Sequence, residues 1–372
     1  MSENKVLGIV FSNMHDHSLG ELTEHRTVGS VPFGGRYRLV DFVLSNMVNS
    51  GIRDVGIITK SNYQSLMDHV GAGREWDLAR KIGGLVILPP FSRTGSGIYR
   101  GSIDALKGIM GYIRHVGAKY VFLSDCDVIA NLNIRQIVDS HAASGADITA
   151  LYKKQTTAAD TGDMTAFTLN KNRRITDVLT NPGPAGEYNM YLNMAVIERQ
   201  LLIKLVNEEF SHGRYSFTQS ILQNQIRDLK IYGYPVEGYC ARIRDQASYF
   251  SANMQLLESW VRQQLFPRER PVYTKVRDEV PAKYGLQARV SNSMVADGCI
   301  IEGSIENSIV FRGVKIGRGA VVRNSIIMQG CVIGENASLN YIITDKDVTI
   351  RDNRTLAGYL TYPVYLQKGI SV

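Results

Sequence analysis

The prediction of this fold starts from residues 31–52, VPFGGRYRLVDFVLSNMVNSGI. Pro32 and the Gly34-Gly35 pair indicate a loop, because both residue types interrupt regular structure. Asp41 can cap a helix that presents an apolar face. Gly51 stands where a residue in the left-handed conformation would end that helix. The segment therefore predicts a loop, a helix and a stop.

Apolar runs that suit buried strands flank this helix and recur along the first 152 residues. The predicted strands are residues 6–11, 55–59, 85–88, 120–124 and 148–152. A second helix, which Ser102 can cap and which ends before Gly117, lies between the third and fourth strands. Unbroken apolar strands that alternate with helices form βαβ units and favour a parallel sheet covered on both faces. A ligand of such a sheet binds beyond the carboxyl ends of its strands.

The pattern becomes mixed after residue 152. Residues 181–184, Asn-Pro-Gly-Pro, predict a turn, and residues 201–206 and 217–226 have helical periodicity. A further helix, over residues 256–265, is followed by three prolines within 15 residues. We therefore predict one domain over residues 1–254 and a connector over residues 255–284.

The last part of the chain, residues 285–372, repeats itself. Asn-Ser pairs at residues 292, 307 and 324 keep step with glycines at residues 298, 313 and 330. Apolar residues recur at intervals of six, at Val310, Ile316 and Val322 and again at Ile327, Ile333 and Leu339. An apolar period of six stacks short strands into the faces of a β-helix. The single step of five, from Val322 to Ile327, predicts one irregular turn, and an ordinary sheet with fortuitous spacing is the alternative.

The composition is that of an ordinary globular protein. Of the 372 residues, 44% are hydrophobic and 21% are charged, and the net charge is +7. This charge suits either an anionic ligand or a mildly basic surface, but the basic residues form no long run, which argues against nucleic acid. Four dispersed cysteines, the lack of an apolar leader and the lack of a membrane-length apolar stretch predict a cytoplasmic protein without a membrane contact.

Residues 32–52 closely resemble the matching segment of bacterial and plant ADP-glucose pyrophosphorylases, which are glucose-1-phosphate adenylyltransferases, and the similarity extends in both directions. The resemblance implies a Rossmann-like nucleotidyltransferase domain with a mostly parallel sheet, followed by a left-handed parallel β-helix. Transfer of a nucleotidyl group needs cations against the triphosphate, a metal held by carboxylates, and accurate positioning. In this chain the positions that match those catalytic elements are altered.

Two cations of the family's phosphate loop are missing. The family pattern G-G-x-G-T-R falls on residues 13–18, NMHDHS, so every glycine is lost and Ser18 replaces the arginine. Val28 replaces the lysine that follows. Without glycine, backbone N–H groups cannot approach phosphates as closely. The alternative interpretation of His15-Asp16-His17 is a zinc site, but an H-x-H run with no distant partner is more typical of a solvated loop.

The carboxylates that would hold Mg²⁺ are partly lost. Asp127 matches the family's first metal aspartate, and Asp125 is an added carboxylate; the pair could hold a divalent ion or simply end a strand. Arg242 stands at the second metal aspartate, where a cation repels the metal. Asp245 could compensate only if the backbone shifted, because strand alternation points it away from the face of Arg242.

The positions that bind the sugar and the effector are also informative. Thr180 and Asn181 match the glutamate and lysine that grip the sugar in the family, which leaves only neutral hydrogen bonding. In contrast, Tyr99, Gly101 and Asp104 match the family segment Y-x-G-T-A-D-A, and with Asp127 they imply a residual nucleotide or sugar pocket.

Two arginines match basic positions that contact phosphorylated effectors in the family. They are Arg36, after the Gly34-Gly35 turn, and Arg53, after Gly51. A guanidinium group suits phosphate through bidentate hydrogen bonding. Two surface arginines without a ligand are the alternative.

Three functions are candidates for this chain. The first, which the resemblance and the altered catalytic positions imply, is a regulatory, catalytically deficient subunit in glycogen biosynthesis. This subunit needs no cofactor of its own. It joins a catalytic partner subunit, which uses Mg²⁺, in a heterotetramer. The second is an active sugar-phosphate nucleotidyltransferase with an altered metal site, which would need a compensating cation such as Arg26. The third, a hexapeptide acyltransferase, needs a histidine base in or beside the repeats, whereas the last histidine of the chain is His212.

Overall fold

The computed structural model describes residues 5–12, 16–90, 99–157, 164–183 and 185–372. The chain folds into two compact units that are each assembled from separate parts of the sequence. Unit 1 contains Met1–Met14, Phe42–Cys240 and Arg270–Tyr273, and unit 2 contains His15–Asp41, Ala241–Glu269 and Thr274–Val372. The division into residues 1–254, 255–284 and 285–372 stays a prediction. None of the described helices is long and apolar enough to cross a membrane.

Unit 1 is built on a mixed sheet, in which the described strands follow the order β10-β9-β11-β6-β1-β4-β5, while β8 pairs with β11 and β12 pairs with β8. The strands are β1 (Val6–Phe11), β4 (Asp54–Ile58), β5 (Gly84–Leu88), β6 (Tyr120–Asp125), β8 (Ile148–Thr157), β9 (Thr165–Leu169), β10 (Ile175–Thr180), β11 (Gly186–Glu198) and β12 (Ile231–Pro235). Strands β5, β4, β1 and β6 are parallel, as predicted. Strand β11 lies antiparallel to both β6 and β8, so β8 does not join β6 directly.

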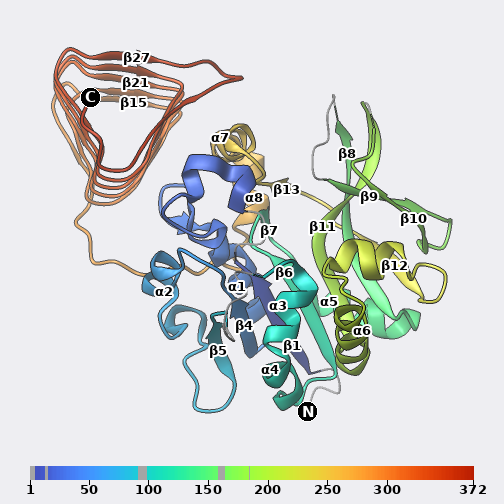
Figure 1. Cartoon of the computed structure of the whole chain (residues 1–372). Coiled ribbons are helices and arrows are strands. Elements are labelled where there is room, and N and C mark those ends of the chain that lie inside the picture. Colours follow the sequence, from blue (N-terminus) through green and yellow to red (C-terminus); the bar gives the residue numbers. More distant parts are fainter. Residues whose placement is uncertain (1–4, 13–15, 91–98, 158–163, 184) are drawn as a thin grey trace. The chain divides into compact units, whose positions relative to one another are not determined.

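Helices cover the sheet of unit 1 on both faces, and Figure 1 shows this layering. They are α1 (Leu39–Asn49), which enters from unit 2, α2 (Gln64–Val70), η3 (Arg74–Trp76), α3 (Ser102–Gly108), α4 (Met110–His115), α5 (Ile134–Ser144), α6 (Arg199–Ser211) and the π-helix η4 (Thr218–Gln223). Residues of α3, α4, α6 and η4 form one buried cluster with Leu7, Ile9 and Phe11 of β1. Helix α1 packs on the other face, where Gly8 leaves room for Met47.

The first helix differs in detail from its prediction. It begins at Leu39, three residues before the start that an Asp41 N-cap predicts, and the Asp41 carboxylate accepts a hydrogen bond from the Arg38 N–H at 3.0 Å. Asp41 therefore stabilises the helix start from the third helical position. At the other end of the helix the prediction is confirmed, because Gly51 has φ 81°. The backbone N–H groups of Gly51 and Ile52 donate hydrogen bonds to carbonyl groups of the last helical turn, as in a Schellman motif.

Three other helix predictions need correction. The Ser102 hydroxyl is not a cap; it accepts from the Phe217 N–H at 2.9 Å, and the predicted helix is divided into α3 and α4. Residues 217–226 contain a π-helix in place of a regular helix. The helix expected over 256–265 is shorter, α8 (Ser259–Leu265), and it is preceded by a helix that was not predicted, α7 (Gln246–Gln255), which Asp245 caps.

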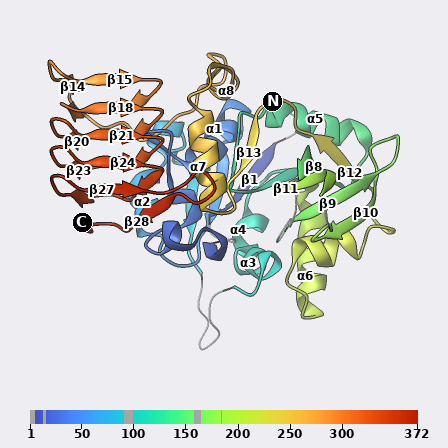
Figure 2. The same ribbon diagram turned by 90° about the horizontal axis from the view of Figure 1, so that it is seen from above.

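The C-terminal part of unit 2 is the β-helix that the sequence repeat predicts, left-handed as the resemblance implies. Three five-stranded parallel sheets form its faces, and all consist of strands two or three residues long. The strands are β14 (Lys283–Tyr284), β15 (Arg289–Ser291), β16 (Met294–Val295), β17 (Ile300–Ile301), β18 (Ser304–Glu306), β19 (Ile309–Val310), β20 (Lys315–Ile316), β21 (Val321–Arg323), β22 (Ile326–Ile327), β23 (Val332–Ile333), β24 (Ser338–Asn340), β25 (Ile342–Thr344), β26 (Thr349–Ile350), β27 (Thr355–Ala357) and β28 (Val364–Leu366). Figure 1 looks down the triangular coils, and Figure 2 shows them stacked.

The repeated residues mark the interior and the corners of the β-helix. The six apolar positions that define the repeat, Val310, Ile316, Val322, Ile327, Ile333 and Leu339, all lie in its buried core. The irregular step after Val322 contains a corner at Asn324, whose φ is 45°. Asn292 donates its side-chain amide to Asn307 at 2.7 Å, and Asn324 donates to Asn340 at 2.9 Å. Asparagine tolerates the left-handed conformation and links neighbouring coils.

Unit 2 also contains elements outside the β-helix. They are η1 (Asp16–Thr23), η2 (Val28–Ser30), the hairpin strands β2 (Pro32–Phe33) and β3 (Tyr37–Arg38), and the helices α7 and α8. Two short strands, β7 (Val128–Ala130) and β13 (Cys240–Arg242), complete the described elements. Gly34 and Gly35 turn the hairpin with φ 59° and 83°. The Tyr249 hydroxyl of α7 donates to the Pro32 carbonyl at 2.7 Å, which anchors the loop to that helix.

Candidate functional site

Two carboxylates lie at the carboxyl end of β6, the edge where a parallel sheet binds its ligands. Asp125 ends the strand and Asp127 follows two residues later; both side chains are more than nine-tenths buried. The Asn193 amide of β11 donates to the Asp125 carboxylate at 2.9 Å, with Asn193 in the left-handed conformation at φ 53°. Asp125 is therefore held by a neutral donor. Among the described residues, no group of three or more histidine, cysteine or acidic side chains gathers to hold a metal, so Asp127 as a metal ligand stays a prediction.

The retained segment that begins at Tyr99 makes contacts of its own. Asp104 accepts hydrogen bonds from the backbone and the guanidinium of Arg100, both at 3.1 Å. The Arg100 guanidinium also lies 3.7 Å from the ring centre of Tyr215. A Cβ atom on Gly101 would lie 2.4 Å from the Tyr215 carbonyl, so only glycine allows this approach. The structure thus gives Gly101 and Asp104 structural roles, and their part in a nucleotide or sugar pocket stays a prediction.

Tyr99 offers a polar group to this region. Its hydroxyl is buried and, within the described part of the chain, makes no hydrogen bond. Burial, assisted by the charge of Asp104, raises the pKa of Tyr99, so the phenol stays protonated at neutral pH. It can therefore donate a hydrogen bond to a ligand but cannot act as a base.

The positions of the missing loop cations lie in unit 2. Val28 is 3% exposed and belongs to η2, so this position now contributes to the apolar interior. The backbone of Ser18 lies in η1, and its side chain is outside the described residues. The candidate zinc run also lies there: His15 and the side chains of Asp16 and His17 are outside the described residues.

The altered sugar-binding and metal-binding positions lie at the ends of strands. Thr180 ends β10, Asn181 follows it, and both are exposed; Asn181 has φ 53°, and its N–H donates to the Met164 carbonyl at 2.8 Å. Arg242 ends β13 and is half-buried. The nearby Asp245 carboxylate accepts from the Ser248 N–H at 2.7 Å as the N-cap of α7. The Asp245 carboxylate thus caps the start of α7.

Arg26 is paired inside unit 2 with a residue of the β-helix. Its Nη2 atom lies 2.7 and 2.6 Å from the two carboxylate oxygens of Asp345, and the two side chains are 4% and 2% exposed. The Tyr365 hydroxyl donates to the same carboxylate at 2.6 Å, and so does the Lys346 N–H at 2.7 Å. This network could not be predicted from the sequence, because its members belong to no common motif.

Lys346 lies beside this network and has an unusual electrostatic environment. Burial lowers its pKa to about 7, and the positive charges of Arg38 and Arg26 act in the same direction. The pKa of Tyr365 is raised by burial and by Asp345. One carboxylate therefore faces several basic groups, and the hydroxyl proton of Tyr365 stays in place to satisfy it.

Arg36, a predicted effector residue, is exposed on the loop of the hairpin. Its guanidinium lies 5.6 Å from the ring centre of Tyr37. Arg312 of the β-helix is 6% exposed; burial and the charge of Arg36 lower its pKa. Asp297 is a distant ion-pair partner for Arg312, at 3.8 Å. Two guanidinium groups that repel each other can together bind an oxyanion.

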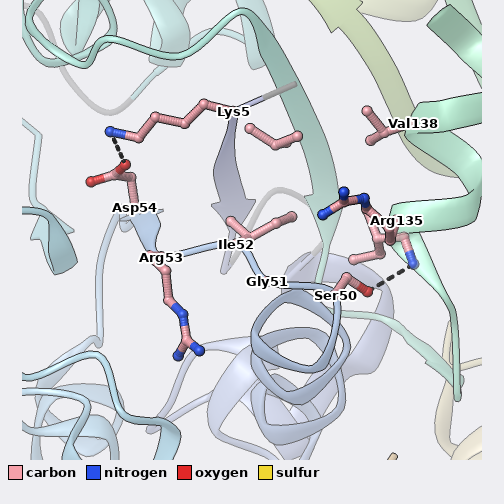
Figure 3. A pocket seen from close by; sticks show the side chains of 10 residues that line it. Lys5, Ser50, Gly51, Ile52, Arg53, Asp54, Arg135 and Val138 are labelled. Atoms are coloured by element: carbon pink, nitrogen blue, oxygen red, sulfur yellow. Dashed lines mark hydrogen bonds and ion pairs between the residues drawn. The ribbon is translucent and has the colours of Figure 1, made fainter. Parts of the chain in front are cut away.

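Arg53, the second predicted effector residue, lines a cavity of about 440 Å³ at the amino ends of β1 and β4. Figure 3 shows Lys5 turned towards Asp54 on one side of this cavity and Arg135 on the other. Arg53 pairs with Asp77 at 3.0 Å, although both side chains are largely exposed. Arg36 and Arg53 belong to different units, and effector binding by either stays a prediction.

Comparisons with known proteins match both parts of this architecture. Residues 17–235 match the nucleotidyl transferase family, and residues 279–359 match the GlmU-like C-terminal hexapeptide family. The chain is 35% identical over 370 residues to the glycogen biosynthesis protein GlgD of Bacillus subtilis, a match that covers 100% of this chain and 98% of that protein.

Two relatives from Geobacillus stearothermophilus are similar over most of the chain. GlgD of this organism is 38% identical over 320 residues, 86% of this chain and 83% of that protein. Its glucose-1-phosphate adenylyltransferase is 32% identical over 331 residues, 86% of this chain and 84% of that protein. The chain therefore belongs to the nucleotidyl transferase family, with GlgD proteins and glucose-1-phosphate adenylyltransferases among its relatives.

Proposed function

We propose that this chain is a regulatory, catalytically deficient subunit of a glucose-1-phosphate adenylyltransferase in glycogen biosynthesis. The reaction of that enzyme converts ATP and glucose 1-phosphate to ADP-glucose and pyrophosphate. This chain leaves the chemistry, and the Mg²⁺ it requires, to a catalytic partner subunit whose activity it raises. We propose that such a pair works in the cytoplasm.

The observation that carries the proposal is the pairing of Arg26. An active site with altered chemistry needs a cation near residues 13–18 to replace those lost at Ser18 and Val28, and Arg26 is the candidate that the sequence offers. Its guanidinium is instead almost fully buried and neutralised by Asp345. A charge held in this way is costly to withdraw, because the partner carboxylate would remain buried and unpaired.

The alternative function is an active sugar-phosphate nucleotidyltransferase with an altered metal site. Its support is the carboxylate pair Asp125 and Asp127, which remains at the ligand-binding edge of the sheet. Against it stand Arg242, at the position of a metal ligand, and Asp245, which caps α7. The regulatory function requires none of these groups to bind metal.

The proposal includes a heterotetramer with the catalytic chain. Light scattering after size-exclusion chromatography of the co-expressed pair should give the mass of four subunits. The accompanying assay compares ADP-glucose formation by this chain, by the partner and by their mixture, with Mg²⁺ and saturating substrates. Stimulation in the mixture supports the proposal, whereas two non-interacting monomers would end it.

Arg36 and Arg53 are proposed to take part in the response to a phosphorylated effector. The support at Arg36 is the nearby Arg312, which adds a second guanidinium. The support at Arg53 is its place beside a cavity with two further basic side chains, Lys5 and Arg135. Effector binding at either arginine does not require this chain to bind substrate.

A further inference from the structure

A second cavity in unit 1, of about 310 Å³, lies where β12 ends and α5 begins. It is separate from the carboxylates at the end of β6, and no function proposed above uses it. Its polar lining includes Asn131, Gln136, Arg173, Tyr234, Glu237 and Arg270. These side chains come from four separate segments of the chain, so the fold itself assembles the cavity.

Arg270 is held in a fixed orientation at this cavity. Its Nε atom donates to the Asn131 side-chain oxygen at 2.9 Å, and the Asn131 amide donates back to the Arg270 carbonyl at 2.8 Å. Arg270 is half-buried, and within the described residues no carboxylate forms an ion pair with it. The reciprocal bonds use Nε and leave the two terminal nitrogens as donors. A preorganised guanidinium fork of this kind matches an oxyanion.

Arg173 supplies a second guanidinium from an unfavourable backbone conformation. It has φ 61°, in the left-handed region, where glycine or asparagine is the usual residue. Its carbonyl accepts from the Gly233 N–H at 2.8 Å, which joins the turn between β9 and β10 to β12. No ion pair forms with Arg173 in the part of the chain that the structure describes. An arginine with a strained backbone and no acidic partner therefore lines the cavity.

The other lining groups suit hydroxyl groups of a ligand. Glu237 is exposed at the rim, and no ion pair engages it among the described residues. Carboxylate, amide and phenol groups together provide both donors and acceptors. The positive end of α5, whose Asn133 side chain accepts from the Gln136 N–H at 3.2 Å, adds a favourable field for an anion.

We propose that this cavity binds a small hydroxylated oxyanion, with the anionic group on Arg173 and Arg270 and the hydroxyl groups on Glu237 and Gln136. Phosphate monoesters and hydroxylated carboxylates share this chemistry. The volume admits a molecule of metabolite size. The proposal concerns binding by this chain alone and does not depend on activation of a catalytic partner.

The decisive variant is Arg173→Gly. Glycine adopts φ 61° without strain, so this variant removes the guanidinium and retains or improves folding. Lys171→Ala is the matched control, because Lys171 is an exposed cation of the same turn that does not line the cavity. Arg270→Gln tests the second guanidinium, and Asp127→Asn tests whether a probe binds instead at the nucleotidyltransferase edge of the sheet.

Isothermal titration of the full chain with glucose 6-phosphate, D-gluconate, inorganic phosphate and glucose tests the site. We expect either glucose 6-phosphate or D-gluconate, depending on which anionic group fits the cavity, to bind about tenfold more tightly than inorganic phosphate. Glucose, which has no anionic group, should not bind. Arg173→Gly and Arg270→Gln should each weaken that binding about tenfold or more, with Lys171→Ala and Asp127→Asn close to wild type. The proposal would be overturned if neither hydroxylated anion binds, or if Arg173→Gly binds as tightly as wild type. It would also be overturned if Lys171→Ala loses as much binding as Arg173→Gly, or if Asp127→Asn loses binding.

Discussion

Arg26 and Asp345 are 319 residues apart in the chain, yet the Arg26 guanidinium contacts both oxygens of the Asp345 carboxylate inside unit 2. The pair joins the segment before the quoted hairpin to the β-helix. It also removes Arg26 from the phosphate-binding role that an active enzyme would require of it. One interaction thus bears on both the stability and the function of the chain.

We expect Arg26→Ala or Asp345→Ala to destabilise the protein by about 3–5 kcal/mol, because each leaves a buried charge without its partner. The measurement is urea unfolding followed by circular dichroism. The triple variant Arg26→Met, Asp345→Leu and Tyr365→Phe replaces the whole network with apolar groups and should cost less than either single variant.

The exposed pair Arg323 and Glu306 is the control for that experiment. Their side chains lie 3.1 Å apart and are 57% and 52% exposed. Removing Glu306 should change stability by less than about 1 kcal/mol, since solvent already screens this pair. If loss of Asp345 costs no more than loss of Glu306, the buried pair does not stabilise the fold.

Stability should rise with pH above neutrality because of Lys346. Burial lowers its folded-state pKa to about 7 from 10.5, while the unfolded chain keeps the usual value. Between these values the unfolded state binds more protons, so the free energy of unfolding increases with pH, and the penalty is fully present below about pH 7. Lys346→Met should flatten this slope in unfolding measured from about pH 7 to pH 10. An identical slope in the variant would contradict the assignment.

The parts of the fold that could be predicted are those with local causes. Gly51 ends α1 because the left-handed conformation favours glycine, and this preference is visible in the sequence. The β-helix could be predicted because each coil pairs with the next, so that paired positions such as Ile316 and Ile333 must both be apolar. Handedness and the nucleotidyltransferase fold came from resemblance.

Features with distant causes could not be predicted. Ser102 looks like a cap, but its hydroxyl accepts from Phe217, which folding brings close. Arg26 could be proposed as a compensating cation because its partner, Asp345, lies 319 residues further along the sequence. The candidate site divides in the same way: the lost chemistry predicted at Val28 and Arg242 follows from matching their positions to the family that the chain resembles, whereas the cavity at Arg173 depends on segments that only the fold assembles.

The effector proposal predicts that Arg36→Ala and Arg53→Ala change the activation curve of the mixed enzyme. Arg36 should have the larger effect, because Asp77 already neutralises part of the charge of Arg53. The measurement is ADP-glucose formation by the mixture at increasing effector concentration, with Arg80→Ala as a control for loss of an exposed arginine that also pairs with Asp77. Effector curves that match wild type in both variants would remove this hypothesis.

The last prediction concerns catalysis by this chain alone. We expect no measurable ADP-glucose synthesis, because a charge-assisted phosphate contact is worth about 1.5–3 kcal/mol and two such cations are absent, at Ser18 and Val28. Arg242 also removes a metal ligand and adds a repelling charge. Together these losses exceed about 6 kcal/mol, or roughly four decades in rate.

It follows that Arg242→Asp alone should not restore turnover. The loop at residues 13–18 would still lack its glycines, and Arg26 would still be paired with Asp345. Stimulation of the partner should persist in this variant, because it requires only an intact fold and interface. The assay compares wild type and variant, each alone and with the partner, at saturating ATP and glucose 1-phosphate. Robust turnover by either lone chain would mean that residues other than those matched to the family supply the chemistry.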